Sequence, residues 1–132
     1  MPEILTELNS INNNVFKNIP SSTEIVSVPN NNFATVTTLD ITAGTWLIIG
    51  QCSFVGNNGM NAIVMVEDVI TANNTLTNST AVRASTGNSD IQKVRIYSTS
   101  TNKTIYLRAY QNSGSDMNVT GNLRAVKLSN EY

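Results

Sequence analysis

The chain has 132 residues, of which 40% are hydrophobic and only 13% are charged, and its formal net charge at pH 7 is −1. This length and hydrophobic content are typical of one globular domain with a core of its own, and the near-zero net charge excludes the basic field that holds a nucleic-acid backbone. No apolar run approaches the roughly 18 residues of a membrane-spanning helix, so we expect no membrane insertion and no nucleic-acid partner.

The N-terminal segment carries the only pattern typical of a helix, over residues 2–18. Ile4, Leu8, Ile11 and Val15 recur at spacings of four, three and four residues, which is the seam of a coiled coil. Pro20 would end such a helix, and an isolated helix of about 15 residues is only marginally stable in water. Such a helix would form only if its apolar stripe packs on partner helices, as a trimeric stalk, or on the rest of the domain. We therefore divide the chain into an N-terminal helix, residues 1–20, and a head domain, residues 21–132.

The rest of the chain alternates between apolar-rich segments and turns made of Asn, Gly, Ser, Thr and Pro. Eight segments are predicted to be strands: Thr23–Val28, Phe33–Ile41, Thr45–Val55, Asn61–Ile70, Thr75–Ala84, Ile91–Ser98, Lys103–Gln111 and Asn118–Leu128. Short strands at this regular spacing favour an antiparallel sandwich or barrel. The fold class expected is therefore all-β, with a short helix at the N-terminus.

The segment Thr45–Val55 is apolar on both of its faces. Leu47 and Ile49 lie on one face, and Trp46 and Ile48 lie on the other. A strand with one face in water alternates apolar and polar residues, so something must cover each side. The simplest cover is a second sheet on one side and another copy of the chain on the other.

Residues that carry common catalytic chemistry are scarce. The chain has no histidine and one cysteine, Cys52, so a Ser-His-Asp or Cys-His arrangement is excluded. Glu67 and Asp68 are adjacent in a predicted strand and point to opposite faces, so they cannot act as an acid/base pair. No cluster of Cys, His or carboxylates has the spacing of metal ligands. We expect no enzyme activity, no metal and no cofactor, although two distant carboxylates could still converge in a glycosidase site.

Two motifs resemble known families. The strand from Gly44 to Phe54 is similar to one in the jelly roll of tumour-necrosis-factor-like and complement globular-head domains, and Lys103–Gln111 followed by Val119–Leu123 resembles the last two strands of that fold. The strings 104–114 and 123–128 are more similar still to C-terminal domains of bacteriophage tail fibres and minor structural proteins. The resemblance covers residues 23–128 and implies a jelly-roll sandwich of about eight to ten antiparallel strands.

The resemblance also implies a function. The proteins that this chain resembles are trimers of jelly rolls that bind a host surface, usually a glycan. The first hypothesis is a non-enzymatic receptor-binding head of a phage tail fibre or baseplate, bound to bacterial surface polysaccharide and joined to an upstream fibre or baseplate protein. Such a protein resides in the virion and is made in the host cytoplasm without a signal peptide. The alternative is a structural trimerisation or capping module of a fibre, with no ligand of its own.

The order of strands in a jelly roll predicts where a ligand would bind. Alternate connections lie at the same end of the sandwich, so the first, third, fifth and seventh are expected together. These connections are the longer ones, and they hold neutral amides and two carboxylates that match sugar hydroxyls. The expected ligand contacts are Asn57, Asn58, Asp90, Asn112 and Asp116. The expected trimer contacts are Ile4, Leu8, Ile11, Leu47 and Ile49.

Overall fold

The computed structural model describes residues 18–20, 23–55, 59–67, 80–83 and 89–132. These residues form nine strands and no helix, so the all-β prediction is confirmed for the described part of the chain. The predicted helix over residues 2–18, with Ile4, Leu8 and Ile11, lies almost wholly outside the described residues.

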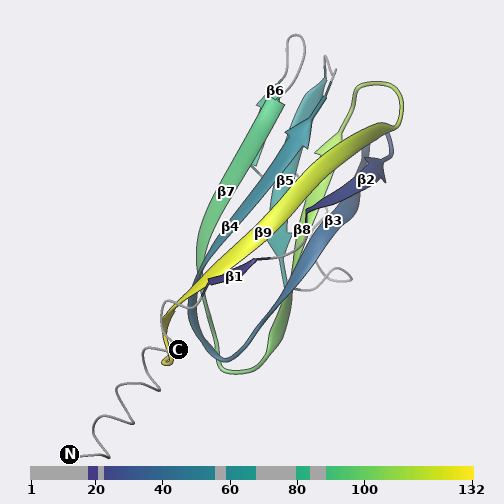
Figure 1. Ribbon diagram of the computed structural model, residues 1–132. Coiled ribbons are helices and arrows are strands. Elements are labelled where there is room, and N and C mark those ends of the chain that lie inside the picture. The colour runs from purple at the N-terminus through teal and green to yellow at the C-terminus, as the bar shows by residue number, and fades with distance from the viewer. Residues whose placement is uncertain (1–17, 21–22, 56–58, 68–79, 84–88) are drawn as a thin grey trace, which may run out of the picture.

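Two antiparallel sheets pack face to face (Figure 1). Sheet A contains β1 (Asn18–Pro20), β2 (Glu24–Val28), β9 (Met117–Ser129), β4 (Gly44–Phe54) and β7 (Ser89–Thr99). In this sheet β4 lies between β9 and β7, while β1 and β2 both pair with β9. Sheet B contains, in spatial order, β3 (Asn32–Ile41), β8 (Lys103–Gln111), β5 (Met60–Val66) and β6 (Thr80–Arg83). The chain crosses between the sheets at nearly every connection, which confirms the jelly-roll sandwich.

One short element departs from the expected organisation. Asn18–Pro20, assigned from the sequence to the end of the N-terminal helix, instead form β1, which pairs antiparallel with Arg124–Val126 of β9. Pairing with an existing edge gives the backbone of this stretch its hydrogen-bond partners, and nothing in the local sequence signals that partner. These three residues therefore belong to sheet A and not to a helix.

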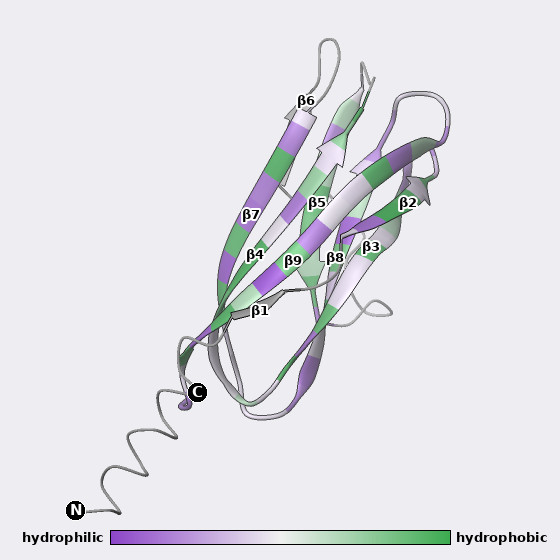
Figure 2. Ribbon diagram, viewed as in Figure 1, coloured by the Kyte–Doolittle hydropathy of each residue, from purple (hydrophilic) through white to green (hydrophobic). Residues whose placement is uncertain are grey.

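The core lies between the two sheets, and β4 shows how the sequence builds it. Trp46, Ile48, Cys52 and Phe54 are buried against sheet B, whereas Leu47 and Ile49 on the opposite face are only half-buried. Figure 2 shows the same alternation along β7 and β9 as bands of opposite hydropathy. The second sheet is thus the cover predicted for one face of β4.

The single cysteine is a core residue. Cys52 is fully buried, and burial raises the pKa of its thiol to about 12. Since the thiolate is the reactive form, we expect Cys52 to resist a thiol reagent at pH 8 in the native protein and to react fully in urea. Equal labelling rates with and without urea would contradict this placement.

Candidate functional site

Different connections between strands form the two ends of the sandwich (Figure 1). The β2–β3 and β8–β9 connections lie together at one end, here called the distal end. The backbone amide of Asn31 donates to the carbonyl of Gln111 over 2.8 Å, and the amide of Gly114 donates to Oδ1 of Asn30 over 2.9 Å. The opposite end, the base, carries the β3–β4 and β7–β8 turns and the end of β9. The predicted grouping of the first and seventh connections is therefore correct.

A buried glutamine holds the β8–β9 connection in place. Gln111 is 0% exposed, and its Nε2 donates to the carbonyl oxygens of Val28, over 2.9 Å, and Ser115, over 2.8 Å. Its Oε1 accepts from the backbone amide of Ser113 over 2.8 Å. The side chain satisfies backbone groups of two connections, which makes the distal end a rigid frame for exposed side chains.

Two further amides join the starts of β5 and β7 to this frame. Oδ1 of Asn112 accepts from the backbone amide of Met60 over 2.6 Å, and Nδ2 of the buried Asn61 donates to Oγ of Ser89 over 2.6 Å. The described residues of the third and fifth connections therefore also lie at the distal end, as the jelly-roll order predicts.

The structure places three of the five predicted ligand contacts. Asp90 and Asp116 are exposed at the distal end, and Asn112 is half-buried there with its amide oxygen taken by Met60. Asn57 and Asn58 lie outside the described residues. The sequence analysis missed Gln111 and Asn61, although each is a polar residue at an inward position of a largely apolar strand, which is a signal for a buried hydrogen-bonding role.

The outer face of sheet A carries a group of aligned apolar side chains near the base. Leu47 of β4 lies opposite Ile96 of β7 and Val126 of β9, and Ile49 lies opposite Val94. Val94 is 56% exposed and Ile96 is 65% exposed. We call this surface the apolar half, defined by Leu47, Ile49, Val94, Ile96 and Val126.

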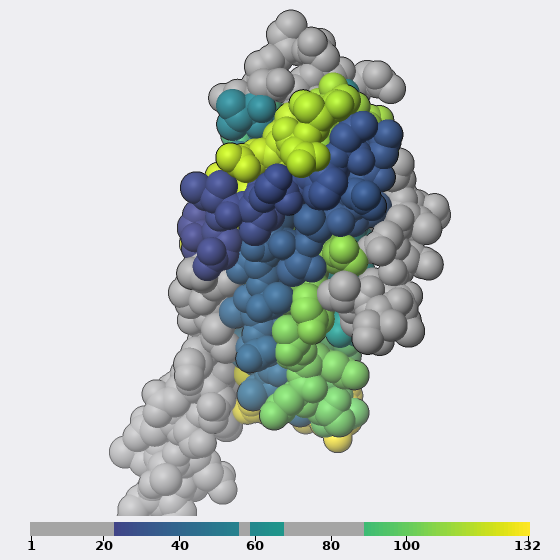
Figure 3. Space-filling view, turned by 90° about the vertical axis from the view of Figure 1, so that its right-hand side faces the viewer, coloured from purple at the N-terminus to yellow at the C-terminus, as the bar shows by residue number. Residues whose placement is uncertain are grey.

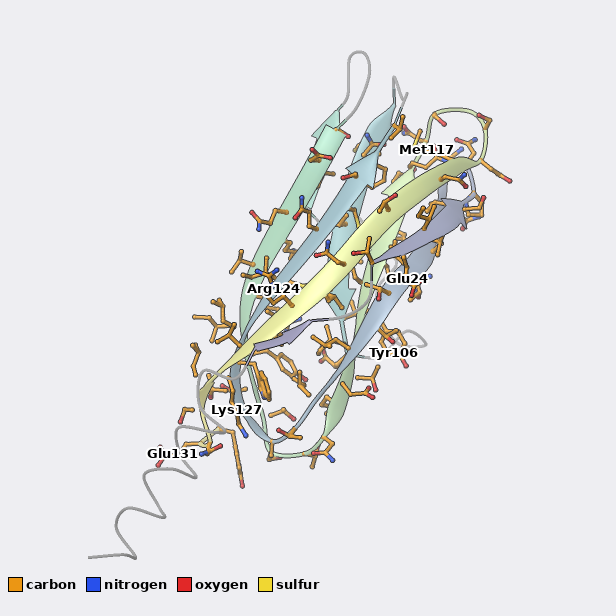
Figure 4. All side chains as sticks on the ribbon, in the orientation of Figure 1. Glu24, Tyr106, Met117, Arg124, Lys127 and Glu131 are labelled. Carbon is orange, nitrogen blue, oxygen red and sulfur yellow. The ribbon has the colours of Figure 1, made fainter. Side chains whose placement is uncertain are left out.

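Toward the distal end the same face becomes polar. Gln51 pairs with Gln92 and Asn122, and Ser53 pairs with Asp90 and Thr120. The labelled side chain of Arg124, opposite Ile49, lies on β9 between the two regions (Figure 4). Apolar side chains that are scattered singly over a surface are ordinary, whereas a contiguous exposed apolar patch is typical of an interaction surface.

Neither a metal site nor a membrane-spanning helix is formed by the described residues. Among them, no three His, Cys, Asp or Glu side chains gather as a metal site would require. None of the described segments is a helix long and apolar enough to cross a membrane.

No family model and no curated protein matches the sequence. Solved structures do share its fold. A structure of infectious bursal disease virus, Gx strain, matches with a TM-score of 0.54 and 14% identity over 88% of this chain and 34% of the virus chain. The VP2 subviral particle of that virus matches with a TM-score of 0.52 and 14% identity, over 86% of this chain and 32% of the other.

A complement globular domain matches this chain with a similar TM-score. The globular domain of zebrafish complement 1qA aligns with a TM-score of 0.52 and 7% identity, over 83% of this chain and 97% of that domain. At such identities the likeness shows the fold alone, and this chain spans about a third of the two virus chains. The class defined by fold and comparison is a jelly-roll β-sandwich domain.

Proposed function

We propose that this domain is the non-enzymatic receptor-binding head of a phage tail fibre or baseplate, a homotrimer that binds bacterial surface glycan through its distal end. The observation that carries the proposal is the separation of the two surfaces. β1 pairs with the part of β9 near the base, so the chain that precedes the head leaves from the base. The distal end then faces away from any upstream fibre or baseplate protein.

The apolar half supplies the contact between copies in this proposal. Interfaces between permanently associated subunits are more apolar than ordinary surface. Leu47 is flanked by Ile96 and Val126, and Ile49 has Val94 on one side and Arg124 on the other. Asn18 pairs with Val126, so the segment that contains Ile4, Leu8 and Ile11 joins the head at the edge of the apolar half. A trimeric stalk and this surface would form one continuous apolar seam.

Replacing Ile96 with lysine is expected to convert the trimer into a folded monomer. The substitution places a charge in the apolar half, while the position is exposed within one chain, so the fold itself tolerates it. Light scattering at micromolar concentration measures the mass. Gln92→Lys, on the same face of β7 but in its polar part, is the control and should remain trimeric. A wild-type protein of monomer mass would refute the trimer.

Alanine substitutions at Asn57, Asn58, Asp90, Asn112 and Asp116 test the distal end as the glycan site. We expect at least one of them to weaken binding to host cells about tenfold or more, because hydrogen bonds to sugar hydroxyls are lost. Ser100→Ala, at the exposed β7–β8 turn of the base, is the control. Unchanged cell binding in all five variants would show that the distal end is not the binding surface.

The second candidate is a structural trimerisation or capping module with no ligand. It is favoured by the way the distal amides serve the protein itself, since Gln111 and Asn112 accept and donate within the loops. A glycan array and intact bacterial cells distinguish the two functions. Binding to the glycan array or to the cells supports the receptor-binding head. A stable trimer that binds neither the array nor the cells supports the structural module.

A further inference from the structure

A hollow of about 290 Å³ lies at the base, and none of its lining residues belongs to the distal end or to the apolar half. It is formed where the end of β3 and the β3–β4 turn meet the β7–β8 turn and the start of β8, and Figure 3 shows these segments side by side at the lower end of the molecule. Its lining residues are Asp40, Ile41, Thr42, Asn102, Lys103 and Thr104. This volume is near the lower limit of about 300 Å³ for small-molecule sites, which suits one ring rather than a chain.

Strand pairing gives the hollow a defined geometry. Asp40 lies directly opposite Thr104, and Ile41 lies opposite Lys103. Oγ1 of Thr104 donates to Oδ1 of Asp40 over 2.7 Å, which orients a carboxylate that remains exposed. Tyr106 follows two residues after Thr104 on the same outward face of β8, and it is labelled in Figure 4. Tyr106 is not one of the residues that line the hollow.

The lining favours a neutral ligand rich in hydroxyl groups. Asp40 only accepts hydrogen bonds, Lys103 only donates them, and Asn102 and the threonines do both. The lining itself holds one negative and one positive charge, Asp40 and Lys103, and Nζ of Lys127 donates to Oγ1 of the lining Thr42 over 3.5 Å. A sugar ring presents adjacent hydroxyls that both donate and accept hydrogen bonds, which matches this mixed set of donors and acceptors.

We propose that this hollow binds a single neutral hexose unit, independently of the distal end. It lies at the base, where β3 and β8 of sheet B meet the adjoining turns, whereas the apolar half lies on the outer face of sheet A. Association of copies through the apolar half would therefore not by itself cover the hollow. The proposal does not depend on the receptor-binding role, because a ring held at the base could belong to any glycan.

The test is titration of the full-length, ¹⁵N-labelled protein with methyl α-D-glucopyranoside and, separately, with its C4 epimer methyl α-D-galactopyranoside. At least one of them should shift the Asn102 side-chain amide and the Lys103 and Thr104 backbone amides in a saturable way at millimolar concentration. Absence of such shifts with both sugars would overturn the proposal. Glycine, a zwitterion, is the control probe, and equal shifts with glycine would overturn the choice of a neutral sugar.

Two variants test the residues themselves. Asp40→Asn keeps the shape and an acceptor for Thr104 but removes the negative charge. Lys103→Gln keeps a donor but removes the positive charge, at an exposed position that the fold does not need. Each should weaken sugar binding about tenfold, since charge-assisted hydrogen bonds are the stronger ones. Glu131→Gln, which removes an exposed carboxylate outside the hollow, is the matched control. Equal weakening of sugar binding by Glu131→Gln would overturn the assignment of these residues to the site. The proposed function is tested separately, by trimer mass and by cell binding.

Discussion

Replacing Trp46 with alanine is expected to lower the free energy of unfolding by about 3–5 kcal/mol, the range found for buried large aromatics. Trp46 is 1% exposed and belongs to the core between the sheets. Its Nε1 donates to the carbonyl of Thr42 over 2.9 Å, and Nζ of Lys127 lies 5.5 Å from the ring centroid. The substitution would leave a cavity and also an unpaired carbonyl in the β3–β4 turn.

Urea unfolding followed by circular dichroism measures this effect. Tyr132→Ala is the control, because Tyr132 is 73% exposed and its removal should change stability by less than about 0.5 kcal/mol. An unchanged midpoint for Trp46→Ala would mean that Trp46 serves binding rather than the core.

Replacing Gln111 with leucine should be nearly as damaging, with an expected loss of about 2–4 kcal/mol. The new side chain is similar in size, so little packing is lost, but the carbonyls of Val28 and Ser115 and the amide of Ser113 each lose their hydrogen bond to Gln111. The carbonyl of Ser115 still accepts from Oγ of Ser113 over 3.1 Å. Each buried polar group left without a hydrogen bond costs about 1–3 kcal/mol, unless water reaches it.

Gln51→Leu is the matched control, because Gln51 is exposed on the outer face of sheet A. It should shift stability by less than about 0.5 kcal/mol. Hydrogen exchange of residues 112–116 is a second measurement and should accelerate only in Gln111→Leu. If Gln111→Leu unfolds at the same urea concentration as the parent and keeps slow exchange, the glutamine does not hold the loop.

Local pattern was enough to predict most of the strands. Lys103–Gln111 was predicted with its observed bounds, because alternation and the flanking turn residues are both contained in the segment itself. The two apolar faces of Thr45–Val55 predicted correctly that a second sheet covers one of them, and the structure shows that it is the face of Trp46. Knowledge of the strand order then placed Asp90, Asn112 and Asp116 at one end.

The tertiary structure decided what depends on residues far apart in the sequence. Asn18–Pro20 became a strand only because β9 offers an edge more than 100 residues later. Leu47 belongs to a larger apolar surface because β7 and β9 place Ile96 and Val126 beside it. The hollow at the base likewise joins Asp40 to Thr104 across a strand pair. Sequence patterns report which face of a strand is apolar, whereas the register of long-range pairing determines which side chains meet, and only the folded chain fixes that register.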